Sequence, residues 1–259
     1  MYFSDSIEII ELQSIREQMK KDYRKCKKNI EHDFRCQVMF DRLFLIGGAD
    51  MKFEWRKHEK ALYGAKSIPA LVDIPTQNFI MIKGSGNPND TDFSDRVAAL
   101  YSLAYAIKMG YKSTVSKNIL SNEIHDFTVY PLEGIWKLKN ADTESATSKL
   151  LKENLEYIIM IRQPDFITAE MVCAALERVK IKKPNRLYEE IIFDTIHDGK
   201  CVEILHIGSY DNEPFSFEQM DKFTEENGLQ RISDCHREIY LTNRTKEDKL
   251  KTILRYKVN

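Results

Sequence analysis

The chain has 259 residues, of which 42% are hydrophobic and 31% charged, and its formal net charge is -1. This length allows one large domain or two small ones with a substantial core, in a composition typical of globular proteins. The near-zero net charge excludes the whole-chain basic excess that attracts nucleic acid or anionic membranes, so we expect no direct nucleic-acid partner.

The five cysteines are odd in number and include no C-x-x-C pair. This pattern disfavours a disulfide framework and a zinc site, and it fits reduced thiols in the cytoplasm. We find no signal-peptide pattern, and no apolar run approaches the roughly 18 residues that a membrane span needs. We therefore expect a cytoplasmic protein with no membrane partner, no metal and no cofactor.

Residues 1–50 are predicted to be an N-terminal helical extension, because apolar residues recur at helical spacing over residues 15–30. Its basic residues are either a solvated face or an arm for nucleic acid or a coiled-coil partner. The codons of a Gly-Gly pair shortly before Met51 can spell a ribosome-binding site. We hypothesise that the native domain comprises residues 51–259 and that the extension is a start-site misassignment.

The next part of the chain has the predicted order strand, helix, strand, strand. An apolar run at residues 79–82 predicts a buried strand, and turn residues follow it. Apolar spacing then predicts a helix, with Asp92 as its expected N-cap and Gly110 as its expected C-cap. Two further strands are predicted at residues 127–136 and 157–161.

The same order recurs nearer the C-terminus. Residues 201–207 are predicted to form a strand, and residues 216–219 match a capping box for a helix that Gly228 ends. Strands are predicted at residues 236–241 and 253–258.

This recurrence predicts an internal repeat joined by a helix at residues 168–180. Gly84 and Gly208 each follow the first strand of a unit, and Glu133 and Glu238 each fall in the strand after its helix. The predicted fold class is α+β, with two strand-helix-strand-strand units forming one antiparallel sheet and the helices on one face. The halves should enclose a central ligand cleft.

The strand at residues 236–241 carries the principal candidate for chemistry. Because side chains alternate along a strand, His236, Glu238 and Tyr240 share one face. The glutamate is either solvated on an exposed sheet face or the anionic contact in an aromatic pocket. In the pocket, apolar surroundings would raise its pKa toward a range useful for acid–base work.

Further aromatic residues can complete such a pocket. Tyr101 and Tyr105 are four residues apart on the first predicted helix and share a face, which alternatively caps the core. Trp136 ends a strand in which Pro131 and Gly134 disfavour a regular ladder, so we expect a bulge there.

Motifs of several enzyme classes are missing from the sequence. It contains no dinucleotide-binding glycine pattern after a strand, no P-loop, no H-E-x-x-H and no G-x-S-x-G. His197 and His206 are interpreted as structural, because neither has further ligands at useful spacing. Cys235 and His236 are not a catalytic pair, since strand neighbours point to opposite faces.

Seven segments together resemble the GyrI-like small-molecule-binding proteins, particularly their stand-alone bacterial branch. The segments are residues 51–55 (MKFEW), 79–90 (FIMIKGSGNPND), 100–105 (LYSLAY), 130–136 (YPLEGIW), 161–165 (IRQPD), 206–211 (HIGSYD) and 236–241 (HREIYL). The resemblance spans about residues 51–258 and leaves out the first fifty. It implies paired strand-helix-strand-strand units around a central cleft.

The family resemblance implies a ligand and a set of site residues. Related regulator domains bind lipophilic cations between aromatic rings and a central glutamate, and part of the stand-alone branch hydrolyses cyclopropanoids and isothiocyanates. The residues expected to act on the ligand are Glu238 and Tyr240. Those expected to bind it are Tyr101, Tyr105, Tyr130, Glu133, Trp136 and His236.

Two functions remain open at this point. In a binding protein, Glu238 is the counter-charge of a hydrophobic or cationic aromatic compound. In a hydrolase that detoxifies electrophiles, Glu238 handles a water proton while a tyrosine hydroxyl stabilises charge. A recognisable DNA-binding domain is missing, which weakens a regulatory role, and the sequence leaves the oligomeric state open.

Overall fold

The computed structural model describes residues 52–115, 124–138, 154–242 and 245–259. These residues belong to one compact unit that runs from Asp50 to Asn259. The helix predicted at residues 15–30 and the start-site hypothesis concern residues outside the described part. Among the helices of the described part, none is both long enough and apolar enough to cross a membrane.

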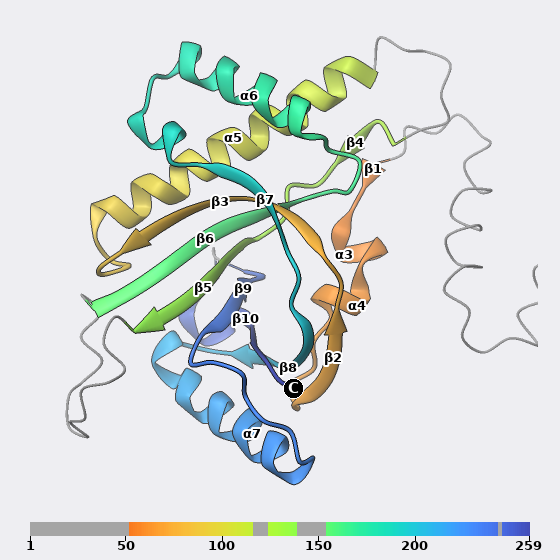
Figure 1. Cartoon of the computed structure of the whole chain (residues 1–259), viewed down its shortest axis with the longest axis vertical. Helices are drawn as coiled ribbons and strands as arrows, with labels where there is room; N and C mark the ends of the chain where they lie inside the picture. Colours follow the sequence, from red (N-terminus) through yellow and green to blue (C-terminus); the bar gives the residue numbers. More distant parts are fainter. Residues whose placement is uncertain (1–51, 116–123, 139–153, 243–244) are drawn as a thin grey trace, which may run out of the picture. The chain divides into compact units, whose positions relative to one another are not determined.

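The described part contains strands, helices and short 3-10 turns in alternation (Figure 1). In chain order they are β1 (Lys52–Phe53), α3 (Trp55–His58), α4 (Lys60–Tyr63), β2 (Ala70–Ile74), β3 (Gln77–Ser85), α5 (Thr91–Val115), β4 (Asp126–Phe127), β5 (Leu132–Leu138), β6 (Leu155–Gln163), α6 (Ala169–Lys182), η2 (Arg186–Glu189), β7 (Ile192–Ile196), β8 (Gly199–Ile207), η3 (Tyr210–Asn212), α7 (Glu213–Glu226), β9 (His236–Tyr240), η4 (Glu247–Lys249) and β10 (Lys251–Lys257).

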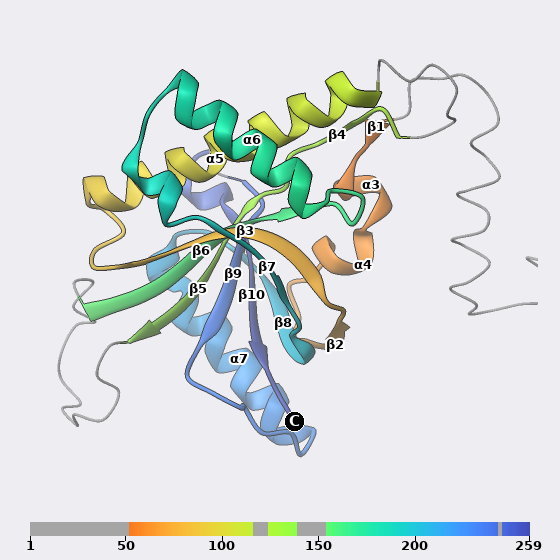
Figure 2. The ribbon, with the colours of Figure 1, turned by 45° about the horizontal axis from the view of Figure 1, so that its top comes forward.

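Eight strands form one curled antiparallel sheet in the order β2-β8-β10-β9-β5-β6-β3-β7. Figures 1 and 2 show α5 and α6 side by side over one end of this sheet and α7 at the other end. The two-stranded pair of β1 and β4 lies outside the sheet order. The predicted α+β class with an antiparallel sheet is confirmed.

Each half of the sheet has one more strand than the sequence predicts. The halves are β2-β3-α5-β5-β6 and β7-β8-α7-β9-β10, and the leading strand of each pairs with the other half. Thus β2 pairs with β8 at the position where Ile74 meets Gly199, and β7 pairs with β3 where Ile196 meets Gln77. The exchanged leading strands tie the two halves together at both edges.

The repeat also matches different glycines from those predicted. Gly84 lies inside β3, where it pairs with Tyr157 of β6. The equivalent pairs Ile74–Gly199 and Ile196–Gln77 make Gln77 the counterpart of Gly199. Gly86 and Gly208 each lie nine residues further on, so these two glycines correspond in the repeat. Both have positive φ, 107° and 130°, which glycine adopts without strain as the chain leaves a strand.

Both long helices of the repeat pack on the same face of the sheet. Ile80 and Ile159 form a core with Leu103 of α5, and Leu254 packs in a core with Met220 of α7. Ile159 pairs with Gly134, Gly134 pairs with Glu238, and Glu238 pairs with Leu254 across neighbouring strands. Cross-strand partners share a face, so Ile159 and Leu254 lie on the same face of the sheet. The central strands β5 and β9 therefore lie between the strands on which α5 and α7 pack.

Helix α5 differs from its prediction at both ends. It begins at Thr91, so Asp92 lies inside its first turn, and it continues through Gly110 to Val115. Gly110 is buried, and a Cβ atom there would meet the guanidinium of Arg178 on α6. The glycine that the pattern suggested as a stop signal therefore allows close packing of α5 on α6.

Helix α7 begins four residues earlier than predicted. It starts at Glu213 with a proline in its first turn, so the predicted capping box at residues 216–219 is wrong. Ser216 instead lies within the helix, and its Oγ is 2.9 Å from Nδ1 of His206 on β8. The predicted end is correct, because Gly228 follows the C-cap with φ 66°.

Candidate functional site

The two central strands bring a set of polar and aromatic side chains to the face between α5 and α7. In the register of β5 with β9, Gly134 lies opposite Glu238 and Trp136 lies opposite His236. Tyr240 follows two residues after Glu238 and therefore points to the same face. This face of the strand pair is the centre of the candidate site.

Glu238 is held by hydrogen bonds to both of its carboxylate oxygens. His236 Nε2 donates to Oε1 at 2.9 Å, and the Tyr240 hydroxyl donates to Oε2 at 2.7 Å. Trp136 Nε1 donates in turn to the Tyr240 oxygen at 3.0 Å. Glu238 is only 8% exposed, so these donors offset the cost of removing a carboxylate from water.

The Tyr240 phenol stays protonated at neutral pH, so its hydroxyl group can act as a hydrogen-bond donor. Burial, followed by the negative charge of Glu238 and their hydrogen bond, raises the pKa of Tyr240 well above its usual value. The phenol is therefore neutral and can donate to a carboxylate or to a developing oxyanion.

Strand β5 has a regular ladder where the sequence suggested a bulge. Its pairing with β6 is continuous from Leu132 to Leu138, and Pro131 lies just before the strand. The predicted bulge is therefore wrong. Gly134 has another role, because a Cβ atom there would lie 2.6 Å from Trp136 Nε1, in space that the indole occupies.

One side of the site is a group of three stacked or tilted aromatic rings. Phe93 of α5 stacks on Trp136 with ring centroids 5.8 Å apart, and Tyr157 of β6 lies 5.3 Å from Trp136. Phe93 and Tyr157 meet edge to face at 5.1 Å. These contacts fix the indole, and they come from a helix and a neighbouring strand that the sequence pattern did not connect to the site.

The other side is formed by η3 and α7. Tyr210 meets Tyr240 edge to face at 6.0 Å, and Phe217 meets His236 in the same way at 4.9 Å. Tyr210 is 44% exposed and the His236 side chain is 22% exposed. Solvent therefore reaches the site beside these two residues.

A second carboxyl group, which the sequence analysis missed, lies near Glu238. Glu213 is the first residue of α7 and is 8% exposed, and its Oε1 has no hydrogen-bond partner in the described part of the chain. Burial, and then the negative charge of Glu238, raise the pKa of Glu213 to about 9. Its side chain is therefore a neutral carboxylic acid at neutral pH.

Two predicted tyrosines lie on α5 in line with Phe93. Tyr101 and Tyr105 have ring centroids 6.4 Å apart. They lie eight and twelve residues after Phe93, with Val97 between, so all of them belong to one row of every fourth residue along the helix surface. Tyr105 is 55% exposed, whereas Tyr101 is partly buried against the core.

Tyr130 and Glu133 are not brought into the Glu238 network. The Tyr130 hydroxyl donates to Glu59 at 2.8 Å, and its ring stacks on Trp55. Glu133 precedes Gly134 on β5 and so points to the opposite face of the sheet. There it is 1% exposed and accepts from the Tyr63 hydroxyl at 3.3 Å.

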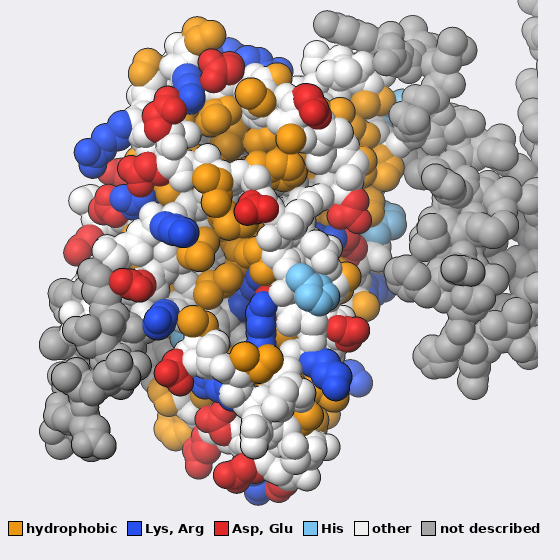
Figure 3. Space-filling view, viewed as in Figure 1, with side chains coloured by type: hydrophobic (Ala, Val, Ile, Leu, Met, Phe, Trp, Pro, Cys, Tyr) orange, Lys and Arg blue, Asp and Glu red, His pale blue; other side chains and the backbone are white. Residues whose placement is uncertain are grey.

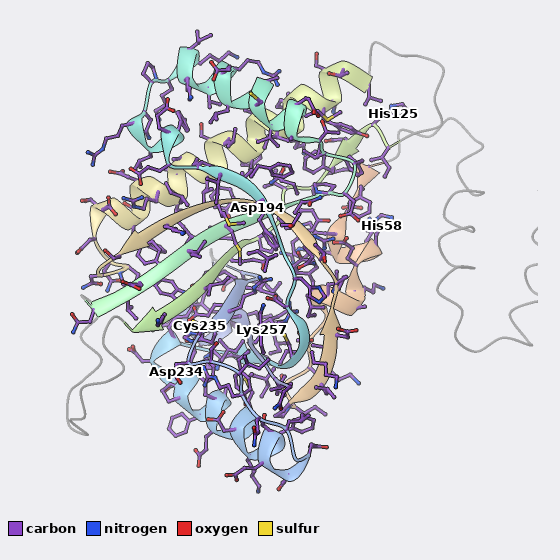
Figure 4. The ribbon with its side chains drawn as sticks, in the orientation of Figure 1. His58, His125, Asp194, Asp234, Cys235 and Lys257 are labelled. Atoms are coloured by element: carbon purple, nitrogen blue, oxygen red, sulfur yellow. The ribbon has the colours of Figure 1, made fainter. Side chains whose placement is uncertain are left out.

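The opposite face of the central strands carries a chain of buried ion pairs. Arg237 Nη1 lies 3.5 Å from Glu133 and 2.9 Å from Asp198, and Lys257, labelled on β10 in Figure 4, lies 3.2 Å from Asp198. Arg237 Nη1 pairs with two acidic residues, whereas Nε and Nη2 of Arg237 are buried without a hydrogen-bond partner in the described part of the chain. This cluster lies on the face of the sheet away from Glu238 and is not part of the candidate site.

A groove of about 560 Å³ lies beside the start of α7. It is lined by Ser67, Ile204, Leu205, His206, Ile207, Asn212, Phe215, Ser216 and Gln219. His206 is 5% exposed, and its two ring nitrogens contact Ser216 Oγ and the Ser209 carbonyl oxygen. The histidine therefore holds α7 to β8, which agrees with the structural role predicted for it from the sequence.

The outer surface in Figure 3 mixes apolar side chains with charges of both signs. Apolar side chains run between the α5–α6 layer and α7, with Lys, Arg, Asp and Glu interspersed around them. This distribution agrees with the net charge of -1 for the whole chain.

Comparison with known proteins gives the family of this fold and site. Residues 69–257 match the model of the GyrI-like small-molecule-binding domain. An uncharacterized conserved protein from Listeria innocua is 31% identical with a TM-score of 0.70, and a hydrolase from the same organism is 30% identical with a TM-score of 0.69. Each comparison covers 80% of this chain and 100% of the other.

A further hydrolase from Listeria innocua is 29% identical over the same shares of both chains, with a TM-score of 0.66. No curated protein matched the sequence. The family match extends over more than half of the chain and confirms the resemblance found in the sequence. This chain belongs to the GyrI-like family of small-molecule-binding domains.

Proposed function

We propose that the site around Glu238 binds lipophilic aromatic small molecules, including aromatic cations. The observation that carries this proposal is a carboxylate fixed by two donors and enclosed by aromatic rings on both sides. A flat apolar ligand gains stacking and buried area from the rings, and a cation also gains the charge of Glu238. Small-molecule binding is the property of the family as a whole.

Each residue of the site has a distinct part in this proposal. Trp136 supplies the principal stacking surface, while His236 and Tyr240 hold the carboxylate in place. Tyr210 is 44% exposed and supplies the rim through which a ligand enters. Because the carboxylate is held before a ligand arrives, little ordering is required on binding.

A titration with ethidium, a cationic aromatic dye, tests this assignment. Trp136→Ala removes the stacking surface and should weaken ethidium binding about tenfold. Glu218→Gln, on the exposed surface of α7, removes a charge outside the site and should leave the affinity unchanged. Equal affinities of wild type and Trp136→Ala would place the ligand elsewhere.

Hydrolysis of electrophilic small molecules such as cyclopropanoids and isothiocyanates is the second candidate function. The observation that favours it is the pairing of an ionisable Glu238 with Glu213, whose raised pKa keeps it protonated. One carboxyl group can take a proton from water. The other, or the Tyr240 hydroxyl, can donate a proton or a hydrogen bond to the substrate atom that gains negative charge. Two similar Listeria structures are described as hydrolases.

Product analysis with benzyl isothiocyanate tests the second candidate. Glu238→Gln preserves the shape of the side chain and removes its basicity, so turnover should fall by about 10²–10⁴-fold. A neutral aromatic ligand should still bind this variant. Full hydrolysis by Glu238→Gln, or no hydrolysis by the wild type, would count against the enzyme.

A further inference from the structure

Glu213 is a buried acid whose position the binding of a neutral ligand does not explain. It lies at the start of α7, a helix of 14 residues, with 8% of its surface exposed. Its Oε1 has no hydrogen-bond partner in the described part of the chain. A buried polar atom without a partner costs free energy, so its presence calls for an explanation.

The titratable groups around Glu213 come from three elements. Strand β9 contributes His236, Glu238 and Tyr240, and η3 contributes Tyr210. His206 of β8 contacts the same helix through Ser216. Among the described residues, neither glutamate has an ion pair with a lysine or arginine.

This arrangement favours one negative charge shared by two carboxyl groups. Two buried carboxylates repel each other, so one of them retains a proton while the other is ionised. Glu238 accepts hydrogen bonds from two donors, His236 and Tyr240. Among the described residues, Oε1 of Glu213 has no such donor, and burial and the charge of Glu238 raise the pKa of Glu213 to about 9.

We propose that the site exchanges a proton for a ligand cation: when an aromatic monocation binds beside Glu238, Glu213 releases its proton and becomes a second counter-charge. This inference rests on the proposed binding site. The O–H bond of the Glu213 carboxyl group breaks, and the proton passes to solvent beside the exposed Tyr210. One positive charge enters and one leaves, so the net charge of the protein–ligand complex equals that of the free protein.

Proton exchange gives the affinity a characteristic pH dependence. Glu213 is protonated in the free protein below about pH 9, so each cation that binds there must displace a proton. Affinity for the cation should therefore rise by up to about tenfold per pH unit between pH 7 and 9 and level off above. A neutral aromatic ligand displaces no proton, and its affinity should not follow this curve.

Isothermal titration calorimetry with ethidium measures the proton directly. The observed binding enthalpy at one pH is compared in phosphate, HEPES and Tris, whose ionisation enthalpies differ, and the slope gives the number of protons released. Wild type and the control Glu218→Gln should release close to one proton per ethidium near pH 7. Glu213→Gln should bind ethidium with a slope near zero.

The outcomes separate this inference from the proposed binding site. Ethidium binding without proton release by the wild type would overturn proton exchange and leave the site intact. Release that persists in Glu213→Gln would assign the proton to another group and overturn it as well. Absence of ethidium binding by the wild type would overturn both proposals. The pH series on wild type alone gives an independent check that requires no variant to fold.

Discussion

Gly134 has no side chain, and the space this leaves is occupied by the Trp136 indole. From that place the indole donates to Tyr240, which donates to Glu238. A residue that sequence patterns mark as unfavourable in a strand thus allows the hydrogen-bond chain to form. The orientation of the Glu238 carboxylate on β9 therefore depends on the position of the Trp136 indole on the neighbouring strand β5.

Gly134→Ala tests this relation. Its Cβ would lie 2.6 Å from Trp136 Nε1, so the indole must move, and the variant should lose about 1–3 kcal/mol of unfolding free energy in urea. Trp136→Phe removes the conflicting nitrogen, so Gly134→Ala should cost less in a Trp136→Phe background than in the wild type. Fully additive losses would show that the two residues act independently.

At the residue scale, the sequence could predict the shared face but not the second acid. Alternation along one strand predicts that His236, Glu238 and Tyr240 point the same way, and the structure has all three in one network. Glu213 comes from helix α7, whereas the other three residues lie on strand β9. No local sequence pattern predicts that Glu213 lies near Glu238, because this proximity depends on how α7 packs on the sheet.

At the scale of elements, the long apolar strands and helices could be predicted and the short edge strands could not. The sequences ALVDI of β2 and IFDTI of β7 are five residues long and partly exposed. Burial alternates along β2 and less regularly along β7, and in both strands an exposed position carries an apolar residue, Leu71 in β2 and Ile192 in β7. Their pairing with the opposite half depends on tertiary contacts, which local propensity does not encode.

The start of α7 shows how a local motif can mislead. Residues 216–219 match a capping box, yet Ser216 instead contacts His206, a residue of strand β8 that lies ten residues earlier in the sequence. A helix capped at Ser216 would leave Glu213 in the preceding loop. Tertiary packing thus determines where α7 begins, and it includes Glu213 in the helix.

Ser216→Ala tests the corrected assignment. The change leaves Nδ1 of the buried His206 without a partner, so the protein should lose about 1–3 kcal/mol of unfolding free energy. Gln219 is exposed, and Gln219→Ala should have little effect. In a capping box both side chains form hydrogen bonds with the helix start, so both changes would lower the unfolding free energy. A comparable loss of unfolding free energy from Gln219→Ala would therefore support a capping box at residues 216–219.

At the scale of the whole molecule, the sheet is one structure shared by two halves. The family match covers residues 69–257, and the exchanged strands β2 and β7 both lie within it. Sequence recurrence could predict two halves, but the exchange that ties their edges together required the strand order. The site lies where the central strands of the two halves pair.

We propose that residues 51–259 fold without the first fifty, because both halves of the sheet lie inside this span. A chain beginning at Met51 should unfold cooperatively, with a thermal midpoint close to that of the full-length protein. The check is thermal unfolding followed by circular dichroism on both chains. A large drop in midpoint, or insolubility of the shorter chain, would make the first fifty residues part of the core.

The charge of Glu238 is tested most directly by two ligands of one shape, 10-methylacridinium and neutral acridine, each titrated into wild type and Glu238→Gln at neutral pH. The wild type should bind the cation about tenfold more tightly than acridine, since a charge in a partly desolvated aromatic site contributes roughly 1–2 kcal/mol. Glu238→Gln should weaken this preference, the double variant Glu238→Gln/Glu213→Gln should abolish it, and both should leave the affinity for acridine unchanged. Equal affinity of wild type for both ligands, or a preference in Glu238→Gln as large as that of wild type, would contradict the role of Glu238 as the counter-charge.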